Sequence, residues 1–173
     1  SYQNQSSLAL VPLTDVEMWT YNDYTVSSDE RVARIGINFG APGDRRSDNG
    51  VLWIDYPSVG GKSPKVSVNV DYFNTIPEGE RIFRHHADRV DQGQGYPWVC
   101  ASGIKDVRRV KVTLNNQNPA EYNVRLYFME PEVQNEQNRS FTVTVNGSNS
   151  ERIDLLEKTK VPLVALTKKY ESI

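Results

Sequence analysis

Hydrophobic and polar residues alternate with a period of two in several short stretches of this chain. In residues 122–128 the even-numbered positions carry Tyr, Val, Leu and Phe, and the odd-numbered positions form the other face. The alternation resumes over residues 141–145 and stops at Asn146-Gly147, a dipeptide suited to the positive φ angles of a hairpin turn. The pattern therefore predicts two half-buried core strands joined by a polar loop, with a hairpin after the second strand.

Shorter stretches of the same kind lie on both sides of this region. In residues 107–114 we expect Val110, Val112 and Leu114 to face the core. Residues 162–170 are compatible with a helix that starts at Pro162 or with a strand, and we favour the strand. Loops that contain Gly, Pro, Asp and Asn separate the remaining predicted strands, at residues 31–39, 51–55, 66–70, 81–84 and 153–155. Many short strands without a convincing amphipathic helix predict an all-β sandwich or jelly roll.

The central region also resembles a known family. Tyr-x-Val-Arg-Leu-Tyr-Phe-x-Glu-Pro at residues 122–131 and Arg-x-Phe-x-Val-x-Val-Asn-Gly at residues 139–147 resemble the central motif of malectin and malectin-like domains. The likeness covers residues 32–173 and leaves residues 1–31 as an N-terminal extension or linker. Four further stretches are similar to the version of this domain that occurs beside β-propellers in large bacterial envelope proteins, at residues 37–40, 50–64, 83–89 and 97–103.

The resemblance implies a jelly-roll-like β-sandwich of the galactose-binding-like kind, located outside the cell or in the bacterial periplasm or envelope. Related domains add a further strand pair after the tail, so we expect C-terminal strands to be missing here and a sheet edge to be open. The resemblance carries over the scaffold rather than the glucose-binding residues of malectin, because residues 131–134 contain no aromatic side chain.

Composition limits the possible partners. The 173 residues fit one domain, and the formal net charge of −2 predicts no attraction to nucleic acid. No apolar run approaches the roughly 20 residues that cross a bilayer. The chain starts at Ser1 without a signal peptide, and we expect it to be a processed or excised segment. The single cysteine, Cys100, allows no internal disulfide and is expected to be a buried thiol.

Catalytic and metal-binding patterns are weak. His85-His86 with Asp88 is the one histidine cluster, and adjacent strand residues point to opposite faces and would not share a metal. We expect one imidazole to pack in the loop layer and the other to be solvated. No cofactor is predicted, although a structural Ca²⁺ is an open alternative at residues 44–49, where oxygen ligands cluster. Without a nucleophile motif we predict that the protein is not an enzyme.

The best candidates for ligand contact are aromatic residues in the loops. Sugar rings stack on aromatic planes, while carboxylates and guanidinium groups bind their hydroxyls. For Trp53 and Trp98 the alternative is a place in the core. The predicted ligand-binding residues are Tyr56, Tyr96, Tyr72, Asp55, Trp98 and Arg84.

Two functions follow from these expectations. The first is a non-catalytic carbohydrate-binding module of a larger secreted or envelope protein. The second is a structural protein-interaction domain or subunit of an envelope complex, whose partners are other subunits or domains of the same assembly. The open sheet edge and the long N-terminal extension favour the second function, and the loop aromatics favour the first.

Overall fold

The structure is a computed structural model that describes residues 32–173 except residues 64, 92, 94, 116–117 and 133–139. The predicted N-terminal extension and most of the predicted polar loop after Glu130 lie outside the described residues. Within the described residues 43% lie in strands and 12% in helices, so the all-β prediction is confirmed at the level of class.

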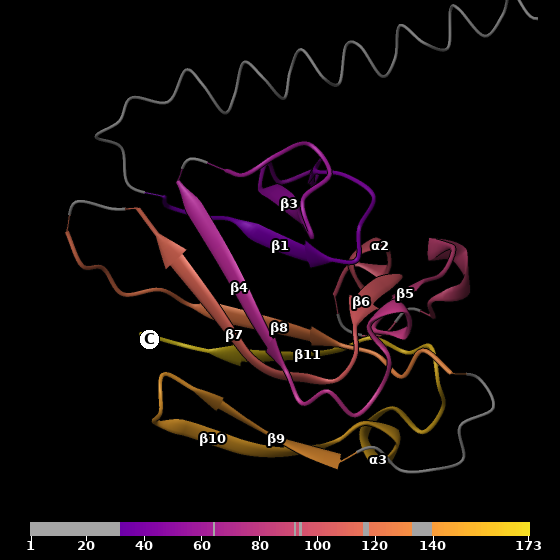
Figure 1. The fold of residues 1–173 in the computed structure, drawn as a ribbon. Helices are drawn as coiled ribbons and strands as arrows, with labels where there is room; N and C mark the ends of the chain where they lie inside the picture. Colours follow the sequence, from indigo (N-terminus) through magenta and orange to yellow (C-terminus); the bar gives the residue numbers. More distant parts are fainter. Residues whose placement is uncertain (1–31, 64, 92, 94, 116–117, 133–139) are drawn as a thin grey trace, which may run out of the picture.

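Within the described residues, five small sheets make up the fold (Figure 1). Strand order is β1-β3-β2 in the largest, and the others are the pairs β4-β7, β5-β6, β8-β11 and β9-β10. The first strands are β1 Gly36–Phe39, β2 Arg45–Arg46, β3 Leu52–Tyr56, β4 Val66–Tyr72, β5 Ile82–Arg84 and β6 Ser102–Ile104. The others are β7 Val107–Leu114, β8 Val124–Phe128, β9 Ser140–Val145, β10 Asn149–Asp154 and β11 Leu166–Tyr170. The part of the chain that the structure describes also contains four helices of one turn or little more, namely η1 Glu78–Glu80, η2 Ala87–Arg89, α2 Pro97–Cys100 and α3 Leu155–Thr159.

Trp53 sets the geometry of the first sheet. It is paired with Gly36 of the parallel strand β1 and with Arg45 of the antiparallel strand β2, so the three residues share one face. A Cβ atom added to Gly36 would lie 2.0 Å from Cδ2 of Trp53. Glycine at position 36 therefore leaves the space into which the indole folds, and Trp53 is only 7% exposed.

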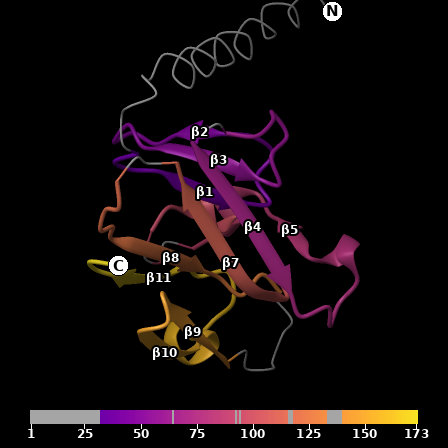
Figure 2. The same ribbon diagram turned by 60° about the vertical axis from the view of Figure 1, so that its left-hand side comes forward.

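The β4-β7 pair corrects one expectation about the core. Val110 and Val112 were expected to face inward, but they are 40% and 43% exposed. They lie opposite Val70 and Val68, which are half-buried. Figures 1 and 2 show why: the pair crosses the molecule as a diagonal ribbon of two strands, and within the described residues no third strand continues its sheet.

The two strands of the central motif lie in different pairs. Strand β8 pairs with β11, which confirms the strand predicted in the tail, and β9 pairs with β10. The rings of Phe128 on β8 and Phe141 on β9 pack against each other with centroids 5.2 Å apart. On the opposite strands, Lys168 of β11 forms a salt bridge with Glu151 of β10. The side chains thus join two ribbons that share no backbone ladder in the described residues.

The predicted hairpin turn is confirmed. The backbone N–H of Ser148 donates to the carbonyl of Val145 over 3.1 Å, and Asn146 and Gly147 have φ of 47° and 75°. Two successive positive φ angles define a type I′ turn, which matches the twist of the two strands. The strand after it, β10, ends one residue earlier than expected, because Asp154 accepts a hydrogen bond from Glu157 N and caps α3.

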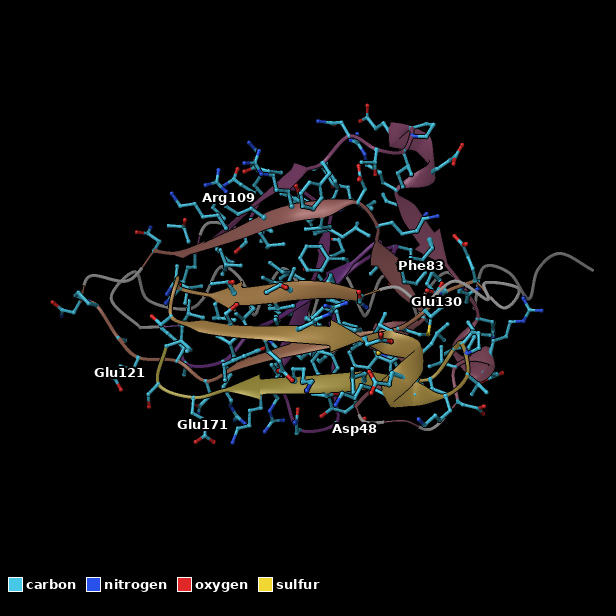
Figure 3. All side chains as sticks on the ribbon, turned by 90° about the horizontal axis from the view of Figure 1, so that it is seen from below. Asp48, Phe83, Arg109, Glu121, Glu130 and Glu171 are labelled. Atoms are coloured by element: carbon cyan, nitrogen blue, oxygen red, sulfur yellow. The ribbon has the colours of Figure 1, made fainter. Side chains whose placement is uncertain are left out.

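An apolar cluster fills the end of the molecule where the loops gather. It contains the buried residues Val90, Cys100, Ala101, Met129 and Ala165. Tyr127, expected on the outer face of its strand, packs against this cluster instead, and its ring also contacts Trp53 of β3. Figure 3 shows Phe83 and Glu130 at this same end, and Glu130 is 1% exposed. No helix among the described residues has the length and apolar character of a bilayer-crossing segment.

Candidate functional site

Four aromatic side chains from three parts of the chain meet at one place, which we call the Trp53 cluster. The indole of Trp53 makes edge contacts with Tyr96, Trp98 and Tyr127, with ring centroids 6.0, 5.4 and 5.7 Å apart. Tyr96 and Trp98 are also in contact, at 5.5 Å and an interplanar angle of 31°. Aromatic pairs of this kind add about 0.5–1.5 kcal/mol each beyond the area they bury.

Local structure explains how Tyr96 and Trp98 come to lie together. Pro97 stands between them at the first position of α2, where its fixed φ favours the start of a helix and its missing N–H costs nothing. The single turn of helix holds Trp98 beside the preceding tyrosine. Burial of Tyr127 in the cluster raises the pKa of its phenol, so it stays a neutral contact at physiological pH.

Trp98 is the member of the cluster that faces a hollow. The hollow has a volume of about 530 Å³, within the range of small-ligand sites. Its lining comes from β2, from the region of η2 and from α2, and consists of Arg45, Ala87, Asp88, Val90, Asp91, Pro97 and Trp98. A half-buried indole, two exposed carboxylates and one guanidinium therefore surround the same open space.

Arg45 occupies one face of this indole. Its Cζ lies 4.6 Å from the centroid of the Trp98 ring, a cation–π contact. The placement follows from strand register, because Arg45 is paired with Trp53 and so projects on the side where the cluster lies. Arg46 next to it donates instead to the carbonyl of Gly50.

The loop at residues 44–50 is anchored to the same cluster. The Nδ2 group of Asn49 donates to the hydroxyl of Tyr96 over 3.1 Å. Asp44 accepts a hydrogen bond from the backbone N–H of Asp55 over 2.7 Å. Within the described residues no three His, Cys, Asp or Glu side chains gather as a metal site would require. The Ca²⁺ alternative for this loop stays a prediction.

The structure brings together two of the six residues predicted from sequence, Tyr96 and Trp98. Asp55 is 3% exposed, and its Oδ2 accepts a hydrogen bond from Val59 N over 2.8 Å, so this carboxylate shapes a loop. Tyr56 packs edge-on against Phe39 at 5.6 Å.

The other two predicted residues have structural contacts of their own. The ring of Tyr72 lies under the guanidinium of Arg81 at 4.3 Å. Nε of Arg84 donates to the carbonyl of Gly40. Neither residue is part of the lining of the hollow.

Sequence reasoning missed the three charged residues of the hollow, Arg45, Asp88 and Asp91. Asp88 and Asp91 resemble ordinary solvated loop carboxylates, and nothing in the linear pattern placed Arg45 against a tryptophan far along the chain. The two histidines behave as expected: His85 is half-buried against Phe83, and His86 is exposed with its Nδ1 3.2 Å from Asp88.

Comparison with known proteins adds no relative. No protein-family model, no curated protein and no solved structure matches this chain. The function must therefore be inferred from the site itself.

Proposed function

We propose that the chain is a non-catalytic carbohydrate-binding module and that the sugar binds in the hollow beside Trp98. The observation that carries the proposal is the meeting of Trp98, Arg45 and two aspartates around one open space of about 530 Å³. The indole provides an apolar plane for the C–H face of a sugar ring. The carboxylates provide acceptors for its hydroxyls, and the guanidinium lies over one face of the indole.

Rigidity of the platform supports the same proposal. Trp98 is packed against Trp53 at 5.4 Å, and Trp53 is itself fixed by its neighbours on both sides in the sheet. A preorganised aromatic surface loses little conformational entropy when a ligand binds. The malectin-like scaffold, with a galactose-binding-like jelly roll in a secreted or envelope protein, is part of this proposal, as the sequence motifs suggest.

The proposal assigns sugar binding without catalysis to this chain, and the state of its cysteine is in keeping with that. The only thiol, Cys100, is 4% exposed, and burial raises its pKa to about 12. A thiol in that state is a poor nucleophile at physiological pH. The proposal assigns Asp88 and Asp91 the role of hydrogen-bond acceptors for hydroxyl groups.

The proposal is tested by calorimetric titration of the full chain with a panel of neutral, acidic and amino sugars. We expect binding to at least one class, a loss of at least tenfold in affinity for Trp98→Ala, and unchanged affinity for Tyr72→Ala. The second variant is the matched control, because it removes an aromatic ring that lies outside the hollow. Absence of binding across the panel, or equal losses in both variants, would contradict the proposal.

A second candidate function is a structural protein-interaction domain within an envelope assembly, and Phe73 favours it. This ring is 61% exposed at the end of β4. Its backbone N–H donates to the carbonyl of Asp106 over 3.0 Å, and Asp106 also binds Thr75, so the ring stands on a fixed loop. Exposed aromatic anchors on rigid supports are typical of binding hot spots.

The two candidates make different predictions. If the chain is an interaction domain, further subunits should copurify with it from the cells that make it, and Phe73→Ser should release them while Trp98→Ala retains them. A carbohydrate-binding module should behave in the opposite way in the sugar titration. A monomer that binds sugar and carries no partner would leave only the first function.

A further inference from the structure

The outer surface of strand β7 has properties that the sugar-binding site does not use. Val68 and Val70 of β4 lie opposite Val112 and Val110 of β7 and form one apolar face, which we call the valine face. The opposite face is polar, with Ser67, Asn69 and Asp71 opposite Thr113, Lys111 and Arg109. The ribbon is thus amphipathic, as a strand pair that packs on something should be.

Other parts of the described structure shield only part of the valine face from solvent. Val66 at the start of β4 is 6% exposed, but Val110 and Val112 are 40% and 43% exposed. The uncovered half is the half on β7. Among the described residues β4 is the only strand that pairs with β7, so the other edge of β7 presents backbone groups available to a further strand.

We propose that residues 8–19 of this same chain dock on the valine face along the free edge of β7. The segment contains the apolar run Leu-Ala-Leu-Val-Pro-Leu at residues 8–13, followed by Val16, Met18 and Trp19. Leu8 and Leu10 stand two apart, so in an extended segment they would point to the same side.

Charge favours this occupant over others. Residues 1–30 contain no Lys or Arg and five acidic residues, Asp15, Glu17, Asp23, Asp29 and Glu30. Strand β7 carries the exposed basic residues Arg108, Arg109 and Lys111, and a strand added at the free edge of β7 would lie beside the polar face, with Arg109 and Lys111, as well as beside the valine face. Figure 3 shows Arg109 on the outer side of the molecule, where only Asp71 forms a salt bridge with it among the described residues. An acidic segment beside a basic edge strand lowers the electrostatic energy of both.

The path of the chain permits the contact. In Figures 1 and 2 the described chain begins close to the end where β4 starts and β7 finishes. The hydroxyl of Tyr122 donates to the carbonyl of Val32 over 2.6 Å and holds this starting point in place. The twelve residues between the docked segment and Val32, residues 20–31, reach on the order of 40 Å when extended, which still exceeds the about 27 Å length of an eight-residue strand.

Disulfide trapping in the full chain tests the proposal. Leu8 and Leu10 are changed to cysteine one at a time, each combined with Val112→Cys. The matched control combines the same two changes with Lys111→Cys, the neighbouring position on the polar face. Cys100 is retained, because its buried thiol does not compete.

We expect an intramolecular disulfide in dilute solution for at least one Val112→Cys pair, at a yield at least tenfold above that of its Lys111→Cys control. Equal yields with positions 111 and 112 would overturn the proposal. Disulfide-linked dimers that form through Val112→Cys would also overturn it, because a second copy would then cover the face.

Hydrogen exchange provides a second measurement that needs no cysteine. The variant Leu8→Ser/Leu10→Ser should speed amide exchange in residues 107–114 by at least tenfold, because the outer amides of β7 lose their partners. Exchange in residues 140–154, on the β9-β10 hairpin, is the internal control. Unchanged exchange in residues 107–114 would contradict docking of the segment. Neither measurement depends on whether the chain binds sugar.

Discussion

The guanidinium of Arg45 covers one face of the Trp98 indole, with its Cζ 4.6 Å from the ring centroid. The guanidinium therefore occupies the surface on which a sugar would stack. A ligand that stacks on this face must displace the guanidinium. The Arg45 side chain therefore shields the face of the Trp98 indole that is proposed to bind the sugar.

This relationship predicts the effect of Arg45→Ala. An exposed cation–π contact is worth about 0.5–1 kcal/mol, so its removal should strengthen the binding of a neutral sugar about two- to fivefold. Calorimetry with the best neutral ligand measures the change. Arg46→Ala is the control, because its guanidinium donates to the carbonyl of Gly50 and not to the ring. Weaker binding by Arg45→Ala would show that the guanidinium contacts the sugar and does not compete with it.

The fit between Gly36 and Trp53 predicts the effect of one added methyl group. In Gly36→Ala the new Cβ would lie 2.0 Å from the indole, so Trp53 must move out of its buried position. We expect the free energy of unfolding to fall by about 1–3 kcal/mol, as for other overpacked cores. Urea denaturation measures this, with Gly43→Ala as the control because the methyl group added there would meet no heavy atom within 4 Å. A loss of equal size in both variants would contradict this packing explanation.

The hydrogen-bonded carboxylate of Asp106 predicts that the folded protein loses stability in acid. Its side chain is 2% exposed, and a hydrogen bond from the Thr75 hydroxyl is the largest of several causes that hold the pKa of this carboxyl below its usual value. The stabilisation is complete above the pKa of about 3.9 in the unfolded chain and is lost as pH falls through the lower folded pKa.

Urea midpoints between pH 7 and pH 2 test this expectation. Asp106→Asn should lower the midpoint at pH 7 and flatten its decline in acid, because asparagine tolerates the positive φ of 65° but carries no charge. The exposed Asp48→Asn serves as the control. Parallel curves for the wild type and Asp106→Asn would rule out a role for this carboxylate.

The burial of Cys100 predicts that its thiol reacts slowly with disulfide reagents in the folded protein. Burial raises its pKa to about 12, so very little thiolate is present at pH 8. The reaction with an aromatic disulfide reagent should be more than about a hundredfold slower than in the urea-unfolded chain, where the ordinary thiol pKa of about 8.5 applies. Because the chain has one cysteine, the measured rate belongs to this residue alone. Equal rates in the two states would mean that Cys100 is open to solvent.

Much of the local structure could be predicted from the sequence. The strand that carries Phe128, the strand that carries Phe141 and the hairpin at Asn146-Gly147 all follow from period-two alternation and from the φ angles that the turn requires. These signals depend on residues close together in the chain. The same reasoning recognised that Tyr96 and Trp98 are candidates for ligand contact, because aromatic residues beside a loop proline stand out in any sequence.

The arrangement of these elements in space was decided only by the tertiary structure. Alternation marks which residues of a strand share a face, but not whether another element covers that face, so Val110 and Val112 lie half in solvent. A carboxylate near an aromatic loop suggests a ligand contact, yet Asp55 is buried and binds the backbone of its own loop. The placement of Arg45 over Trp98 depends on the pairing of β2 with β3 and on the packing of α2 against Trp53, and such long-range contacts leave no periodic trace in the sequence.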